Sequence, residues 1–163
     1  MTLRLARSDD ADRILEMMSA FYAESDMPLD RGQARAALAT LTADPALGRL
    51  WTIQPGNALA GYIAVTFGFS LEYLGRDAFI DDFYIEPPHR GRGLGNSVLE
   101  IVESECRALG VRALHLEVGR GNAAGQSLYR KRGFRDNDRQ LLSLRLGPES
   151  RDASRQDASA KKR

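Results

Sequence analysis

Residues 78–96 read Ala78-Phe79-Ile80-Asp81-Asp82-Phe83-Tyr84-Ile85-Glu86-Pro87-Pro88-His89-Arg90-Gly91-Arg92-Gly93-Leu94-Gly95-Asn96. The first half alternates apolar and polar residues and is rich in aromatic and β-branched types, which predicts a strand. The strand ends at Pro87-Pro88, because proline has no N–H to give to the ladder. A glycine-rich loop follows, and the apolar spacing over residues 94–109 predicts an amphipathic helix.

A strand, a glycine loop and a helix in this order aim unpaired backbone N–H groups and a helix N-terminus at one point, where an anion binds. Glycine lets the backbone approach that anion closely. The third glycine of a dinucleotide fingerprint is absent, and Asn96-Ser97 stand where a Walker loop needs Lys and Ser/Thr. The pattern that remains is Arg90-x-x-Gly93-x-Gly95, which predicts an anion cradle over residues 90–96.

Length and composition bound the class of protein. A chain of 163 residues predicts one domain, which we place at 1–147, and the polar residues 148–163 predict a disordered tail. No apolar run approaches the ~18 residues of a membrane span, and the N-terminus shows no signal-peptide core. The single cysteine excludes an intrachain disulfide. We therefore expect a cytoplasmic protein with no membrane partner and no metal site.

Charge is distributed unevenly along the chain. The net charge of +1 gives no support to a nucleic-acid partner. Residues 1–89 carry 7 Lys/Arg against 13 Asp/Glu, whereas residues 90–135 carry 9 against 4. This distribution fits a polyanionic cofactor at the glycine loop and a cationic substrate near the acidic half, and chance segregation of surface charge is the alternative.

The remaining patterns predict further helices and strands on both sides of the central stretch. Before it, we expect a strand at 2–5, a helix capped at 8–11, a second helix at 31–41, and strands at 50–53 and 58–71. After it, we expect a strand at 111–118, a helix at 123–132 and a last strand at 140–146.

A second informative block is Asn122-Ala123-Ala124-Gly125-Gln126-Ser127-Leu128-Tyr129-Arg130-Lys131-Arg132-Gly133-Phe134. It begins with Asn at a loop–helix junction, carries Tyr129 two turns later and ends on Gly-Phe. Together with the Arg-x-x-Gly-x-Gly loop, this block resembles the GNAT superfamily of N-acetyltransferases. The resemblance covers residues 78–134, and the flanking order of elements agrees with it. It implies an α/β (α+β) fold with a mixed, mostly antiparallel central sheet, flanked by helices and splayed at the acyl-CoA site.

The resemblance also implies transfer of an acetyl group from acetyl-CoA to a primary amine by direct attack. Tyr129, with an ordinary pKa near ~10, suits the acid that protonates the leaving thiolate. The run 80–85 is similar to the diamine (spermidine/spermine) acetyltransferases, whose substrate-contacting glutamate falls at Asp81. The shorter Asp81 side chain favours a water relay over direct proton abstraction. Asp81 and Asp82, being adjacent on a strand, are expected on opposite faces, and His115 and Glu117 are rival bases.

The same resemblance assigns the cofactor-binding residues. Backbone groups of Phe83, Tyr84 and Ile85 pair with pantetheine, and an N–H near Tyr84 faces the thioester oxygen. The loop that holds the pyrophosphate comprises Arg90, Gly91, Arg92, Gly93, Leu94, Gly95 and Asn96. The later helix at 123–132, with its cap, contributes Asn122 and Gly125. Four arginines are candidates for phosphate charge, with a solvated surface role as the alternative for each: Arg90, Arg92, Arg130 and Arg132.

Several alternatives stay open at this point. Cys106 shares an apolar helix face with Leu99 and Val102, so we expect a buried thiol rather than an acyl-carrying nucleophile. Tyr22, Glu24 and Asp26 are weak substrate candidates. The acceptor is expected to be a small polyamine- or amino-acid-like amine, with a protein lysine or N-terminus as the second reading. A non-catalytic acyl-CoA-binding module is the third. The chain is either a monomer or a homodimer.

Overall fold

The computed structural model describes residues 1–56 and 58–147, so the predicted tail at 148–163 lies outside the described residues. The N-terminal part forms β1 (Thr2–Leu5), the one-turn helix η1 (Ser8–Asp10), α1 (Ala11–Glu24) and α2 (Arg31–Ala43). Three long strands follow: β2 (Gly48–Gln54), β3 (Gly61–Ser70) and β4 (Gly75–Ile85). The C-terminal part forms η2 (Pro87–His89), α3 (Leu94–Ala108), β5 (Ala113–Leu116) and α4 (Ala123–Lys131). These elements confirm the mixed α/β architecture.

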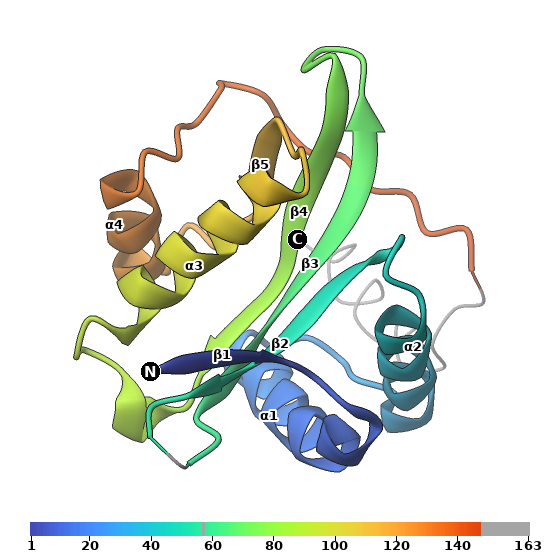
Figure 1. Ribbon diagram of the computed structural model, residues 1–163, viewed down its shortest axis with the longest axis vertical. Helices are drawn as coiled ribbons and strands as arrows, with labels where there is room; N and C mark the ends of the chain where they lie inside the picture. The colour runs from blue at the N-terminus through green and yellow to red at the C-terminus, as the bar shows by residue number, and fades with distance from the viewer. Residues whose placement is uncertain (57, 148–163) are drawn as a thin grey trace, which may run out of the picture.

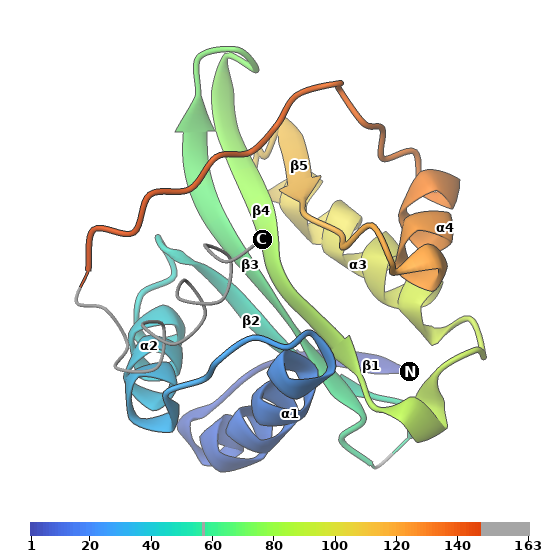
Figure 2. The same cartoon turned by 180° about the vertical axis from the view of Figure 1, so that it is seen from behind.

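The five strands form one twisted sheet in the order β1-β2-β3-β4-β5. Neighbours from β1 to β4 are antiparallel, and β4 and β5 are parallel. Helices cover both faces: α3 lies on the face nearer the viewer in Figure 1, and α1 and α2 lie on the face nearer the viewer in Figure 2. Leu128 and Tyr129 of α4 pack against the core under α3. The parallel pair follows from connectivity, because α3 carries the chain from the end of β4 to the start of β5.

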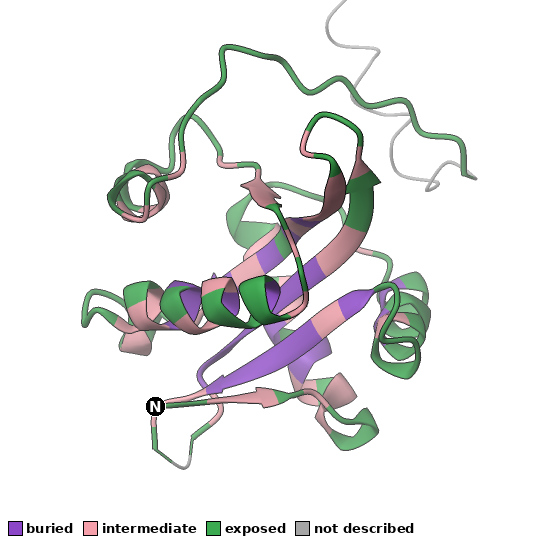
Figure 3. Ribbon diagram, turned by 45° about the horizontal axis from the view of Figure 1, so that its top comes forward, coloured by how far each residue is buried: buried purple, intermediate pink, exposed green. Residues whose placement is uncertain are grey.

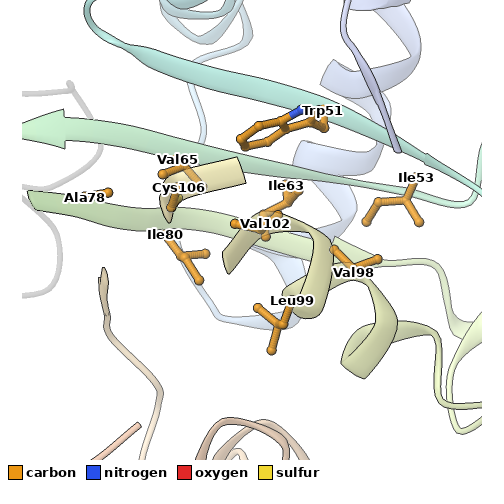
Figure 4. Close-up of a cluster of buried hydrophobic side chains, with 10 residues drawn as sticks. All are labelled: Trp51, Ile53, Ile63, Val65, Ala78, Ile80, Val98, Leu99, Val102 and Cys106. Carbon is orange, nitrogen blue, oxygen red and sulfur yellow. The ribbon is translucent and has the colours of Figure 1, made fainter. Parts of the chain in front are cut away.

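Each face of the sheet has its own apolar core, and the purple strands of Figure 3 lie between them. The core under α3 is drawn in Figure 4 and consists of Trp51, Ile53, Ile63, Val65, Ala78, Ile80, Val98, Leu99, Val102 and Cys106. The core under α1 and α2 consists of Ile14, Leu15, Met17, Ala34, Leu38, Leu50, Tyr62, Ala64 and Tyr84. No described helix is long and apolar enough to serve as a membrane span.

The prediction of a last strand at residues 140–146 is wrong for the described chain. Residues 140–146 form no helix or strand, and Leu141, Leu142, Leu144 and Leu146 are 65–91% exposed. The alternation of leucine with Ser143 and Arg145 describes a local conformational preference, and a strand also needs a partner ladder. The described chain provides none at this place.

Candidate active site

The site begins at an irregularity in β4. Ala64 pairs with Asp82 and Val65 pairs with Ile80, so Asp81 is an extra residue with no partner on β3. Such a bulge interrupts the alternation of side chains along a strand. Ile80 and Phe83 therefore both pack on the α3 side, although they are three residues apart, while Asp82 and Tyr84 are buried on the α1 side.

This bulge bears on the expectation for the two aspartates. Simple alternation predicted Asp81 and Asp82 on opposite faces, and the register shift interrupts that alternation at Asp81. Asp81 is exposed, and Asp82 is only 7% exposed. The two carboxylates therefore differ strongly in their access to solvent.

Asp82 is the centre of a buried polar cluster. The Tyr62 hydroxyl donates a hydrogen bond of 2.9 Å to Oδ2 of Asp82. Burial raises the pKa of Asp82 to about 6, opposed by this hydrogen bond and assisted by the charge of Asp81. Burial and the Asp82 carboxylate raise the pKa of Tyr22 to about 12. The sequence indicated Tyr22 only as a weak substrate candidate. It gave no signal for Tyr62, because Tyr62 reaches Asp82, twenty residues away, only through the register of the strands.

The sheet opens next to the bulge. The β4–β5 ladder runs from Asp77–Ala113 to Ile80–Leu116 and stops there. Phe83, Tyr84 and Ile85 consequently have no strand on that side within the residues that the structure describes. These are the three residues whose backbone groups were expected to pair with pantetheine.

The glycine loop follows from this open edge. Gly91 and Gly93 have φ of +75° and +78°, a left-handed conformation that favours glycine. A Cβ added at either residue meets no atom within 4 Å, so open space lies beside this backbone. Gly93 is the N-cap of α3 and gives the first turn no side-chain cap, which leaves the N–H groups of Leu94, Gly95 and Asn96 available to an anion.

Gly95 has a different role from the other loop glycines. A Cβ at Gly95 lies 3.0 Å from Cδ2 of Leu128, a residue of α4. Its lack of a side chain therefore permits the close packing of α3 against α4, which bears Tyr129.

The four candidate arginines fall into two groups. Arg90 donates to both carboxylate oxygens of Glu24 at 3.0 Å and to the Ile85 carbonyl at 2.6 Å. Arg132 is likewise held by both oxygens of Glu103 at 2.8 Å. Arg130 contacts only the Gln126 side-chain oxygen, and within the described ranges Arg92 makes no ion pair. Arg90 thus joins the loop to the end of α1, and among the described residues no carboxylate pairs with the guanidinium of Arg92 or Arg130.

Tyr129 lies half-buried on α4. Its ring packs edge-on against Phe134 with centroids 5.8 Å apart, and burial raises the pKa of its hydroxyl. The hydroxyl is therefore protonated at neutral pH and has no hydrogen-bond partner in the described part of the chain. At the other end of α4, the Asn122 side chain accepts a hydrogen bond of 2.8 Å from the Gly125 N–H, so these two predicted cofactor residues form the helix cap.

The remaining candidates lie on β5, directly after β5, and in the core under α3. His115 Nε2 is 3.7 Å from Asp77 Oδ2, and its ring lies 5.3 Å from that of Tyr73. Glu117 is exposed just beyond β5. Cys106 is 3% exposed in the core under α3, and burial raises the pKa of its thiol to about 11. A thiol with so high a pKa is a poor nucleophile at neutral pH.

Comparison with known proteins agrees with this arrangement. The sequence profile of the acetyltransferase (GNAT) family matches residues 11–134, which is more than half of the chain. An integron cassette protein from the mobile metagenome of Cole Harbour Salt Marsh is 39% identical, with a TM-score of 0.80, over 90% of this chain and 91% of that one. A predicted acetyltransferase from Clostridium acetobutylicum, solved with acetyl-CoA, has a TM-score of 0.74 at 20% identity, over 89% and 96% of the two chains.

One curated relative carries a more specific name. The thialysine N-epsilon-acetyltransferase of Bos taurus is 30% identical over 81 residues, which are 50% of this chain and 47% of that protein. The chain spans less than half the length of this relative.

Proposed function

The chain belongs to the acetyltransferase (GNAT) family, and from that premise we propose that it transfers an acetyl group from acetyl-CoA to a primary amine of a small molecule. The observation that carries this proposal is the opening of the sheet after Ile80 and Leu116. The uncapped N-terminus of α3 lies on one side of it and the Asp82 cluster on the other. A donor and an acceptor that enter from opposite faces meet in such an opening without a covalent enzyme intermediate.

The glycine loop and the open edge of β4 fit the donor. The N–H groups of residues 94–96 would hold the pyrophosphate, and the space beside Gly91 and Gly93 admits it. Phe83, Tyr84 and Ile85 offer backbone groups to the pantetheine amides, as an added strand would use them. Arg92 and Arg130 supply positive charge. Acetyl-CoA provides the activated acetyl group, and the known complex of the Clostridium acetobutylicum protein supports this choice of donor.

The acidic cluster fits a cationic acceptor. A protonated amine has no lone pair, so a group of the protein must take its proton before attack. Exposed Asp81 would meet the ammonium group through a water molecule, and Asp82, with a pKa of about 6, is poised to hold the proton near neutral pH. The name of the bovine thialysine relative supports an amino group on an amino-acid-like or polyamine-like molecule.

Tyr129 supplies the acid at the end of the reaction. Its hydroxyl is protonated, half-buried and free to donate to the departing sulfur. A backbone N–H near Tyr84, on the strand edge that β5 leaves open, would stabilise the negative charge that develops on the thioester oxygen.

The test is a panel of amines with acetyl-CoA, in which release of free thiol is followed. The panel contains spermidine, lysine-like amino acids, a lysine peptide and a peptide with a free N-terminus. We expect small amines to give turnover that depends on Asp81, so that Asp81→Asn loses activity while Asp9→Asn, on the exposed one-turn helix η1, retains it. Faster turnover of a peptide would contradict the small-molecule assignment. Binding of acetyl-CoA with no thiol release from any amine would indicate a non-catalytic module.

A further inference from the structure

Residues 86–90 lie between the end of β4 and the glycine loop, and they are bonded to both ends of α1. Near the start of the helix, Arg13 pairs with Glu86, with Nη2 and Oε1 2.5 Å apart. At the last residue of the helix, both carboxylate oxygens of Glu24 accept hydrogen bonds of 3.0 Å from Arg90. The segment that leads into the cofactor loop is therefore tied to a helix on the face of the sheet opposite α3.

The two helix residues of these ion pairs carry charges that an isolated helix disfavours. Arg13 lies in the first turn of α1, and Glu24 is its last residue. The helix macrodipole favours negative side chains at the N-terminus and positive side chains at the C-terminus, so both positions have the unfavourable sign. A charge that conflicts with local structure indicates a tertiary role, and here the tertiary partners are Glu86 and Arg90.

The last turn of α1 depends on this tertiary contact more than the first turns do. The fully buried residues of α1 all fall in its first half: Ile14, Leu15 and Met17. The last turn meets the end of β4 through the ring of Phe21, whose centroid is 5.7 Å from that of Tyr84, and through the ion pair of Glu24.

Arg90 makes further contacts that give this ion pair a defined geometry. Its Nε donates a hydrogen bond of 2.6 Å to the Ile85 carbonyl, and its guanidinium carbon lies 5.2 Å from the ring centroid of Tyr84. The Tyr84 hydroxyl lies 3.4 Å from Oε1 of Glu24. An isolated exposed ion pair is weak, but here one guanidinium joins the open edge of β4, the glycine loop and α1.

The same last turn of α1 faces the acidic cluster of the site. Tyr22 lies on this turn, and burial together with the Asp82 carboxylate raises the pKa of its hydroxyl to about 12. A shift of the turn would move Tyr22 relative to Asp82. In a site that must orient two reactants, a small displacement of one wall is enough to impair the reaction.

We propose that Glu24 and Arg90 are positioning residues for the amine: their ion pair fixes the last turn of α1, with Tyr22, where the amine meets the acetyl group. Arg90 therefore acts on the acceptor side through Glu24, and Arg92 and Arg130 are the arginines that meet the phosphates. This inference rests on the proposed function, because it requires an amine and acetyl-CoA in the same opening of the sheet.

Calorimetry on the full-length chain tests the proposal without requiring turnover. CoA is bound first, and spermidine or lysine is then titrated into the complex. We expect Arg90→Gln and Glu24→Gln each to weaken amine binding by about fivefold to tenfold. The double variant should bind the amine no more weakly than either single variant, because both substitutions remove the same contact.

Two further measurements serve as controls. The affinity for CoA itself should change by less than about twofold in Arg90→Gln and Glu24→Gln, whereas Arg92→Gln should lower it. Asp12→Asn breaks a different ion pair of α1, with Arg35 of α2, and should bind the amine like the wild type.

Each competing role of the pair predicts a different result. If Glu24 binds the amine directly, Arg90→Gln frees the carboxylate and strengthens amine binding, while Glu24→Gln weakens it. If Arg90 is a phosphate ligand, Arg90→Gln lowers CoA affinity and leaves amine binding unchanged. Either result overturns the proposal, as do additive losses in the double variant or a wild-type complex that binds neither amine. A wild type that binds the amine as expected but releases no thiol from acetyl-CoA contradicts the proposed function alone.

Discussion

The hydroxyl of Tyr62 donates a hydrogen bond of 2.9 Å to Oδ2 of Asp82, inside the core between the sheet and α1. The two residues come from the neighbouring strands β3 and β4. Ala64 faces Asp82 beside the bulge at Asp81, and Tyr62 lies two residues before Ala64 on the same strand. A buried carboxylate with one neutral donor is only partly compensated, so its charge is costly and the pKa of Asp82 rises to about 6.

This pKa predicts how stability depends on pH. Between about pH 4, where an unfolded aspartate loses its proton, and about pH 6, the folded chain keeps a proton that the unfolded chain has lost. The free energy of unfolding should therefore fall as pH rises through this window, by about 3 kcal/mol for a shift of about two units. Asp82→Asn should remove this contribution. In urea unfolding, the free energy of unfolding of the variant should therefore rise relative to that of the wild type between pH 4 and pH 7.

Asp26→Asn is the control for this measurement, because Asp26 is exposed and asparagine tolerates its positive φ of 51°. It should follow the wild type at every pH. A stability difference between Asp82→Asn and wild type that is constant with pH would mean that Asp82 does not titrate in this window.

Gly93→Ala should weaken binding of CoA. The added Cβ meets nothing in the free protein but projects from the loop where we place the pyrophosphate, and the φ of +78° costs any other residue about 1–2 kcal/mol. Gly110→Ala is a matched control, since Gly110 has φ of +75° and open space at the far end of α3. Both variants should lose similar thermal stability, and calorimetry should show loss of CoA affinity only for Gly93→Ala. Equal affinities would contradict the position of the cradle.

Tyr129→Phe should separate turnover from binding. The ring and its packing against Phe134 remain, while the proton donor is lost. Because the hydroxyl matters when charge builds on the departing sulfur, we expect turnover to fall by the ~10²–10⁴-fold typical of a lost general acid. CoA affinity should be almost unchanged. Unaltered turnover would make Tyr129 a packing residue, and parallel losses of turnover and affinity would assign the hydroxyl to cofactor binding.

Cys106→Ala should retain most of the activity and sequential kinetics. The thiol is buried in the core under α3, and its pKa of about 11 keeps it protonated. The variant should lose about 1 kcal/mol of stability through the small cavity it creates. Mass spectrometry of enzyme incubated with acetyl-CoA alone checks the kinetic statement, since an acetyl group on Cys106 would require a covalent route.

The local features of the site were predictable from the sequence. Pro87-Pro88 ends a strand and Gly93 begins a helix because backbone chemistry restricts both residues wherever they occur. The amphipathic spacing over 94–109 likewise locates a helix and buries Cys106. These preferences depend on residues within one or two turns of each other, so a linear pattern contains them.

The tertiary structure alone decided which residues meet. Pairing with β3 creates the bulge at Asp81, brings Tyr62 to Asp82 and defeats the alternation that predicted opposite faces. Glu24 meets Arg90 across 66 residues, so the guanidinium of this predicted phosphate ligand is also paired with a carboxylate of α1. Residues 140–146 have the pattern of a strand but pair with no strand among the residues that the structure describes. Side-chain periodicity is a local property, whereas register and choice of partner depend on how distant segments pack.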